Sequence, residues 1–189
     1  ALLKRGANVN YSDSSGKTPL LTAVESDAGL EIIQALVKHG VHVQHRDRVE
    51  CTALHYVNVG RNWYAEDQDS DAYDVVKYLL KHGADPYAAN MSSQTGVEAA
   101  LKDYKILRGM VDHMVDLADD RLTSDNQSTL LHHASFEESD RRIVDLLFKE
   151  GFHVDARNDD GRTPLHQAVC GHSDASVIEA LLRRAPDLS

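Results

Sequence analysis

Histidine and cysteine are the residues of this chain whose chemistry is easiest to recognise, and their spacing argues against a metal site. The sequence of 189 residues holds 11 histidines and two cysteines. His39, His42 and His45 lie three residues apart, and Cys51 follows six residues after His45. Zinc needs three or four ligands that converge, but Gly40 is expected to break the helix that carries this series. We therefore predict no metal and no cofactor.

The residues that could take part in catalysis do not form the pattern of a catalytic site either. Neither Cys51 nor Cys170 has an evident base and orienting partner, which a cysteine nucleophile needs. The carboxylates are spread over solvated faces instead of being paired for acid–base catalysis. The sequence has no glycine-rich phosphate loop and no nucleotide-binding fingerprint. We predict a protein that is not an enzyme, and we keep a histidine-based, metal-dependent activity as a third hypothesis.

The composition limits the class of partner. The chain has 30 acidic and 20 basic residues, a formal net charge of −10 with histidine neutral, and 42% hydrophobic residues. This charge argues against nucleic acid or an anionic membrane surface as the partner, and no apolar stretch approaches the ~20 residues that span a bilayer. Two cysteines exclude a disulfide scaffold. We expect an intracellular, cytoplasmic chain, with the nucleus as an alternative, that is monomeric on its own.

Five similar tetrapeptides recur along the chain, and their threonines are 34, 43, 34 and 34 residues apart. They are Thr18-Pro19-Leu20-Leu21, Thr52-Ala53-Leu54-His55, Thr95-Gly96-Val97-Glu98, Thr129-Leu130-Leu131-His132 and Thr163-Pro164-Leu165-His166. A glycine series keeps the same step, with Leu117 in the fourth place: Gly6, Gly40, Gly83, Leu117 and Gly151. A repeat of this period indicates a solenoid of stacked units.

Each unit predicts two helices. The threonine is expected to cap the first helix, proline suits the first helical position where present, and the third motif residue, Leu165 in the last unit, is placed in the core. The first helices are predicted to end near residues 23–24, 57–58, 100–101, 134–135 and 168–169. Amphipathic second helices are predicted over 30–38, 73–81, 106–115, 142–149 and 177–184. In the third unit we expect this helix to run on towards Asp119.

With these motifs the sequence resembles the ankyrin repeat family. Two further segments support the resemblance, Leu2-Leu3-Lys4-Arg5-Gly6-Ala7-Asn8-Val9-Asn10 and Leu79-Leu80-Lys81-His82-Gly83-Ala84-Asp85, and Asp13-Ser14-Ser15-Gly16 and Asn158-Asp159-Asp160-Gly161 resemble the family's hairpin tips. The resemblance implies an all-α fold, an ankyrin-repeat solenoid of helix-turn-helix units joined by β-hairpin-like loops. It implies a single domain over 1–189, with a truncated repeat at 1–10 and repeats at 11–44, 45–87, 88–121, 122–155 and 156–189.

The chain departs from the family pattern in several places. Most units have 34 residues, whereas the family usually has 33, and the third unit lacks the proline, leucine and histidine of the motif. Gln127 stands where a hairpin glycine is expected, so we predict a different tip there. The resemblance implies that the histidines of the motif connect neighbouring repeats. Because the chain begins at Ala1 as though within a helix, we expect a piece of a longer protein.

The second repeat carries nine extra residues, which we assign to an insertion at 61–72. From Arg61 to Asp74 there are five acids and one base, and the insertion contains the single tryptophan, Trp63, beside Tyr64. Repeats tolerate insertions in loops better than in packed helices. Two interpretations stay open: the aromatic pair packs over its own helix ends and anchors a solvated loop, or it engages a partner that has a basic surface.

The resemblance implies that a partner binds on the concave surface of the solenoid, formed by hairpin tips and the exposed ends of first helices. The hairpin candidates are Ser14, Ser15, Lys17, Arg48, Val49, Met91, Ser92, Gln94, Asp125, Asn126, Asp159, Asp160 and Arg162. The helix-end candidates are Glu25, Val59, Lys102, Phe136 and Glu137. The candidates in the insertion are Trp63, Tyr64, Asp67 and Asp69.

The functional hypothesis is a non-catalytic protein–protein interaction module that acts as an adaptor, scaffold or inhibitor. It would bind another protein through the concave surface and through the acidic, aromatic insertion. The alternative is a regulatory or substrate-recruiting segment of a larger enzyme, ion channel or ubiquitin-ligase adaptor, because the family's repeats occur in all three.

Overall fold

A computed structural model describes residues 7–57, 71–123, 126–136 and 140–184 of the chain. Its α-helices are α1 (Pro19–Glu25), α2 (Leu30–Lys38), α3 (Ala53–Tyr56), α4 (Ala72–Lys81), α5 (Gly96–Ala100), α6 (Tyr104–Asp112), α7 (Leu130–Ala134), α8 (Arg141–Lys149), α9 (Pro164–Cys170) and α10 (Ala175–Leu182). A short 3-10 helix, η2, covers Asp120–Leu122. Within these ranges the structure has no β-strand, and its β-type pairing is one isolated bridge between Ala89 and Thr95.

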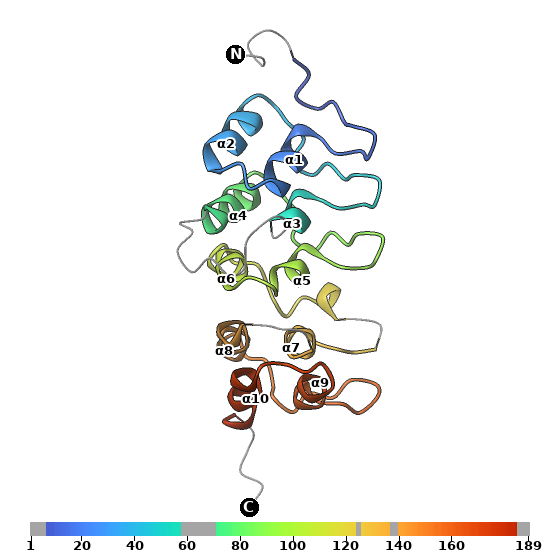
Figure 1. Ribbon diagram of the computed structural model, residues 1–189, viewed down its shortest axis with the longest axis vertical. Helices are drawn as coiled ribbons and strands as arrows, with labels where there is room; N and C mark the ends of the chain where they lie inside the picture. Colours follow the sequence, from blue (N-terminus) through green and yellow to red (C-terminus); the bar gives the residue numbers. More distant parts are fainter. Residues whose placement is uncertain (1–6, 58–70, 124–125, 137–139, 185–189) are drawn as a thin grey trace, which may run out of the picture.

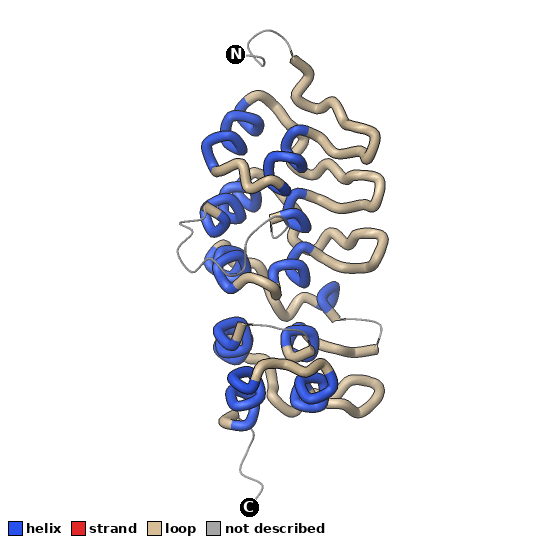
Figure 2. Tube along the Cα trace, in the orientation of Figure 1, coloured by secondary structure: helices blue, strands red, loops and turns tan. Residues whose placement is uncertain are grey.

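The helices are stacked in two rows. Figure 1 shows the odd-numbered helices, the first of each unit, in one row, and the even-numbered second helices in a row beside it. The loops that join successive units project away from both rows on the side of the first helices, and Figure 2 shows them as long turns without strands. This is the all-α solenoid that the sequence predicts.

Threonines begin the first helices, and the residue three positions later completes the cap. In α3, Thr52 Oγ1 lies 2.9 Å from His55 Nδ1, and the Thr52 backbone N–H donates to the same nitrogen. In α5, the Glu98 carboxylate replaces the histidine and accepts from Thr95. A leucine stands at this position of α1, and Thr18 Oγ1 is consequently buried without a hydrogen-bond partner in the described part of the chain.

The end of α6 differs from the prediction. This helix ends at Asp112 instead of running on towards Asp119, and the left-handed residue after it is Met114, with φ of 62°. Its closing hydrogen bonds, such as the one from Val115 N–H to Met110 O, match those that Gly40 permits after α2. Leu117, which the glycine series places at this turn, is instead buried in the core.

The fourth hairpin tip also differs from the prediction. Gln127 adopts φ of 55° and keeps the left-handed conformation that Gly16 and Gly161 adopt at the equivalent tips. Glu50 and Ser93 do the same in the second and third hairpins. This residue of the tip therefore has a positive φ in all five units, although glycine occupies only two of these positions.

The core runs between the two rows of helices through the whole stack. The third motif residue is fully buried in α1, α3, α5 and α7, where it is Leu20, Leu54, Val97 and Leu131. Leu165 is only half-buried, contrary to the prediction, because no described unit stacks on the outer side of α9. Gly109 of α6 lies against α4, where a Cβ atom would meet the backbone oxygen of Tyr73 at 3.2 Å.

Candidate functional site

The hairpin tips of successive units are joined by backbone hydrogen bonds. Arg48 N–H donates to Ser15 O at 3.1 Å, and Met91 N–H donates to Val49 O at 3.0 Å. In the C-terminal units, Asp159 N–H donates to Asn126 O at 2.9 Å. We call the exposed tip residues the hairpin ridge: Ser14, Ser15, Arg48, Val49, Met91, Ser92, Asn126, Asp159 and Asp160.

Most of the other predicted contact residues divide between exposed and half-buried positions. Arg162, Lys102 and Phe136 are exposed, and Lys17, Glu25 and Gln94 are half-buried. The remaining candidates lie outside the described residues, namely Val59, Trp63, Tyr64, Asp67, Asp69, Asp125 and Glu137.

An aspartate or asparagine shapes each of four hairpins from within. Asp13, Asp47 and Asn90 each accept hydrogen bonds from backbone N–H groups two and four residues later. Asn158 accepts from the N–H four residues later. These residues lie five positions before the motif threonine, a regular spacing that sequence reasoning missed. They fix the tip conformation and so the direction in which the ridge side chains point.

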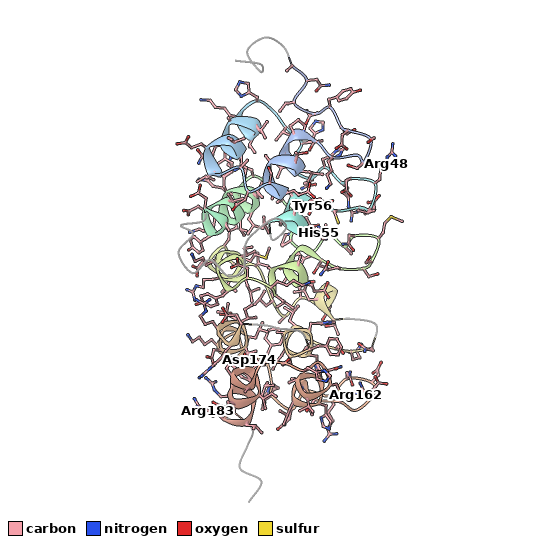
Figure 3. The ribbon with its side chains drawn as sticks, viewed as in Figure 1. Arg48, His55, Tyr56, Arg162, Asp174 and Arg183 are labelled. Carbon is pink, nitrogen blue, oxygen red and sulfur yellow. The ribbon has the colours of Figure 1, made fainter. Side chains whose placement is uncertain are left out.

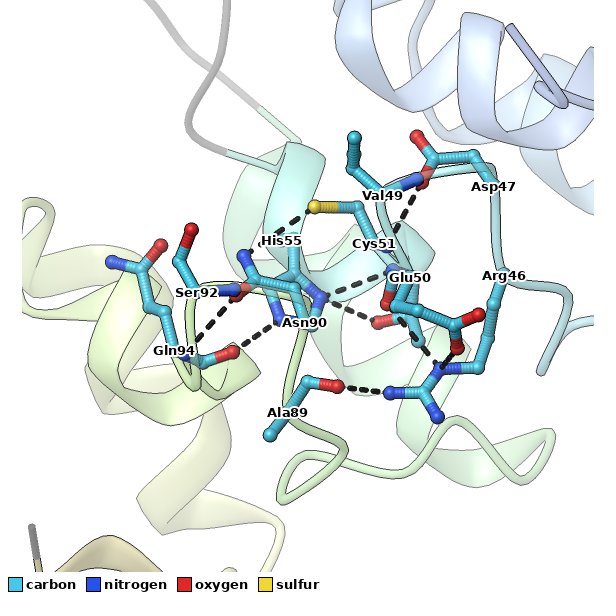
Figure 4. Close-up of polar contacts among 11 residues, drawn as sticks. Arg46, Asp47, Val49, Glu50, Cys51, His55, Ala89, Asn90, Ser92 and Gln94 are labelled. Atoms are coloured by element: carbon cyan, nitrogen blue, oxygen red, sulfur yellow. Dashed lines mark hydrogen bonds and ion pairs between the residues drawn. The ribbon is translucent and has the colours of Figure 1, made fainter. Parts of the chain in front are cut away.

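Histidines of the motif connect first helices to the following hairpin. His55 Nε2 lies 2.8 Å from Gln94 O, and His132 Nε2 lies 3.0 Å from Arg162 O (Figure 4 shows the first bond). Because Nδ1 accepts from the threonine N–H, Nε2 must carry the proton that is donated to the carbonyl. Burial lowers the pKa of both imidazoles, which keeps them neutral. The bridging role that the resemblance implies is present in α3 and α7.

Lys17 and Glu25 are engaged with each other, although the sequence offers them as separate contact residues. Lys17 Nζ lies 2.6 Å from the Glu25 carboxylate and 4.5 Å from the centre of the Tyr56 ring. The Tyr56 hydroxyl donates to Asp47 at 2.5 Å. Burial and the adjacent Asp47 carboxylate raise the pKa of this phenol. These four side chains form a supporting cluster beneath the hairpin ridge, and a partner would have to break an ion pair to use Lys17.

Metal and thiol chemistry find little support in the described geometry. No three His, Cys, Asp or Glu side chains in this part of the chain are grouped so that they could hold a metal ion. His39 Nδ1 lies 2.8 Å from Ala35 O, and His45 Nε2 lies 2.8 Å from Gly16 O. Burial raises the pKa of the Cys51 thiol, which disfavours the reactive thiolate. The described helices are all too short or too polar to cross a membrane.

Comparison with known proteins identifies the repeat. A family model described as "Ankyrin repeats (3 copies)" matches residues 1–90 and 92–189. SH3 and multiple ankyrin repeat domains protein 2 of Homo sapiens is 28% identical over 189 residues, which is 100% of this chain but 8% of that protein. A transient receptor potential cation channel subfamily A member 1 homolog of Caenorhabditis elegans is 27% identical, with 94% of this chain and 16% of that protein covered.

A rice protein and a solved structure extend the comparison. A probable E3 ubiquitin-protein ligase, XBOS34, of Oryza sativa subsp. japonica is 30% identical over 53% of this chain and 18% of that protein. Among solved structures, a chain in the complex of the Bd0816 predatory endopeptidase from Bdellovibrio bacteriovorus with immunity protein Bd3460 superposes with a TM-score of 0.70. It shares 21% identity, with 97% of this chain and 89% of that chain covered. That likeness concerns the fold alone.

Proposed function

The chain belongs to the ankyrin repeat family, and from this premise we propose that it is a non-catalytic adaptor, scaffold or inhibitor that binds its partner through the hairpin ridge and the first helices. Repeats of this family are protein-interaction modules. The observation that carries the proposal is the row of tips, joined by backbone hydrogen bonds among the first three units and between the last two, which presents exposed side chains on one side of the stack.

The exposed side chains of the hairpin ridge differ from unit to unit, as expected of a surface that is specific for one partner. The second and third tips carry Arg48, Val49 and Met91, whereas the fifth carries Asp159 and Asp160. One residue of each tip has a positive φ in all five units, and backbone hydrogen bonds join the tips of the first three units and those of the last two. Binding to such a preorganised surface loses little conformational entropy.

The proposal can be tested by affinity capture with matched variants of the 189-residue chain. We expect Ser14→Arg combined with Ser92→Arg, two changes on the hairpin ridge, to abolish capture of the partner that the wild type retains. Gln34→Arg combined with Met114→Arg adds the same charge at exposed positions away from the ridge and should leave capture unchanged. Equal capture by both variants would exclude the ridge, provided that thermal melting shows both to be folded.

We propose a second contact at the acidic insertion, residues 61–72, of which 61–70 lie outside the described residues and Ala72 begins α4. Trp63 and Tyr64 would serve as anchors, and Asp67 and Asp69 would face a basic surface. Asp67→Lys combined with Asp69→Lys should then weaken binding of the captured partner and reduce its dependence on salt. Binding and salt dependence equal to those of the wild type would remove the insertion from the interface.

A regulatory or substrate-recruiting role within a longer protein is the second candidate function. The chain spans 8% to 18% of the length of the scaffold, channel and ligase relatives above. If the native polypeptide carries an enzyme, pore or ligase segment, removing this repeat domain should change its regulation or the substrates it recruits. A native polypeptide without such a segment would exclude this role.

The assembly state and location are proposals too. We propose that the 189-residue chain is monomeric and intracellular, in the cytoplasm or the nucleus. Light scattering coupled to size-exclusion chromatography should return the mass of a single chain, 20.9 kDa, and a mass of twice that value would contradict the monomer.

A further inference from the structure

We propose that the second and third hairpin tips form a docking site for an acidic peptide segment of the partner that also carries a large apolar side chain. This inference rests on the proposed function, because it names the chemistry of a partner on the hairpin ridge. Three residues define the site, which we call the Arg48 patch: Arg48, Val49 and Met91.

Two apolar side chains of the Arg48 patch are exposed on adjacent tips. Val49 is 51% exposed and Met91 is 72% exposed, and the Met91 N–H donates to the Val49 carbonyl at 3.0 Å, which places the two tips side by side. Single exposed apolar residues are common, but a pair on neighbouring units is a contiguous contact surface. Methionine adapts its shape to an apolar partner side chain. The patch therefore fits a branched or aromatic anchor.

Basic groups around the patch are already paired, with one exception. Lys17 forms an ion pair with Glu25, and Arg46 forms one with Glu50 at 3.1 Å and also donates to Ala89 O. Figure 4 shows the Arg46 contacts on the hairpin next to the patch. The guanidinium of Arg48 has no hydrogen bond or ion pair with the described residues, and Figure 3 shows it at the outer edge of the tips.

Two carboxylates near the patch accept hydrogen bonds from groups of the protein. Asp47 is 5% exposed and receives hydrogen bonds from the Tyr56 hydroxyl and from two backbone N–H groups. Asp13, on the first hairpin, accepts from the Ser15 hydroxyl and from backbone N–H groups, and these bonds lower its pKa. The two carboxylates are thus engaged in hydrogen bonds within the chain, whereas the guanidinium N–H groups of Arg48 have no acceptor among the described residues.

An unpaired guanidinium beside an apolar surface favours a carboxylate ligand. Arginine can bind a carboxylate through two parallel N–H···O bonds, which gives both energy and orientation. A basic segment would face repulsion at this point. The net charge of −10 opposes every anionic partner, but it opposes a phosphate backbone, with one charge per nucleotide, more than a short segment that needs a single carboxylate at Arg48. The geometry therefore favours an acidic protein segment over nucleic acid.

The inference can be tested with a displayed library of random twelve-residue peptides selected on the immobilised 189-residue chain. We expect the selected peptides to be rich in Asp or Glu within a few positions of Leu, Ile, Met or Phe. A fluorescein-labelled copy of the most enriched peptide, followed by fluorescence anisotropy, should bind at least about tenfold more weakly to Arg48→Glu and to Met91→Asp. Met91→Leu should retain most of the affinity.

A matched control separates the patch from general charge effects. Arg183→Glu makes the same charge change at the residue that follows α10, far from the tips in Figure 3, and should leave peptide affinity unchanged. Selection of basic or uncharged peptides, selection of no peptide, or equal binding by Arg48→Glu and wild type would each overturn the inference. Those outcomes leave the proposed function standing if the ridge variant Ser14→Arg with Ser92→Arg still loses the captured partner, so the two proposals fail separately.

Discussion

At the scale of single residues, buried polar side chains both cap helices and connect units. His55 and His132 each use one ring nitrogen to complete a helix cap and the other to reach the next hairpin. Asp47 performs a related task, because it holds its own hairpin and accepts from Tyr56 of the following helix. Removing one of these contacts would leave a buried polar group with neither a protein partner nor water. The resulting decrease in the free energy of unfolding should be measurable.

The two bridging histidines predict a pH dependence of stability. Burial lowers their pKa from the ordinary value of 6.5 in the folded state, so below that pH the unfolded chain binds more protons and folding is disfavoured. We expect the free energy of unfolding to fall between about pH 7.5 and about pH 5.5. Urea denaturation of His55→Gln combined with His132→Gln should show a weaker pH dependence than wild type. The same slope in both proteins would contradict this assignment.

Removal of the Tyr56 hydroxyl should destabilise the hairpin that supports the Arg48 patch. Tyr56→Phe leaves one oxygen of the buried Asp47 without its donor, and we expect a loss of about 1–2 kcal/mol in the free energy of unfolding. Tyr11 is 74% exposed and supplies the control, because Tyr11→Phe should have no effect. Urea denaturation of the two variants makes the comparison, and a Tyr56→Phe protein as stable as wild type would show that this hydrogen bond contributes nothing.

At the scale of helices and turns, the sequence predicts those helix boundaries that are set by a local pattern of residues. The second helix of the first unit is predicted over 30–38 and observed at Leu30–Lys38, because apolar periodicity and Gly40 mark its face and its end. The end of α6 was not predictable in this way, since a methionine there adopts the left-handed conformation. The Lys17–Glu25 ion pair was not predictable either, because residues eight apart meet only through the fold.

Met114 offers a direct test of the strain at the end of α6. Its side chain is 92% exposed, so replacing it removes no core contact, while φ of 62° is unfavourable for any residue that has a Cβ atom. We expect Met114→Gly to raise the free energy of unfolding by about 0.5–1 kcal/mol. Met114→Ala keeps the Cβ atom and should give no such gain. A Met114→Gly protein that is less stable than Met114→Ala would show that the turn is unstrained.

At the scale of the whole molecule, the stack is not uniform. The junction between the third and fourth units lacks the histidine bridge, because Glu98 caps α5 but has no N–H to donate to the next hairpin. Helices α5 and α7 pack less extensively than the other neighbouring first helices, and η2 lies in the connection between these units (Figure 1). The third unit lacks the proline, leucine and histidine of the motif, but the reduced packing between the third and fourth first helices follows only from the structure.

This junction should divide the unfolding of the stack. In a repeat protein each unit is stabilised by its neighbours, so a weak interface lets the two sides open separately. Leu131 is fully buried in α7, and Leu131→Ala should lower the free energy of unfolding by about 2–4 kcal/mol. In the Leu131→Ala protein we expect native-state hydrogen exchange to be faster in α7–α10, with little change in α1–α4. Leu54→Ala in α3 is the reciprocal control and should act on α1–α6. Exchange that increases equally along the whole chain in both variants would show a single cooperative unit and would contradict a weak junction.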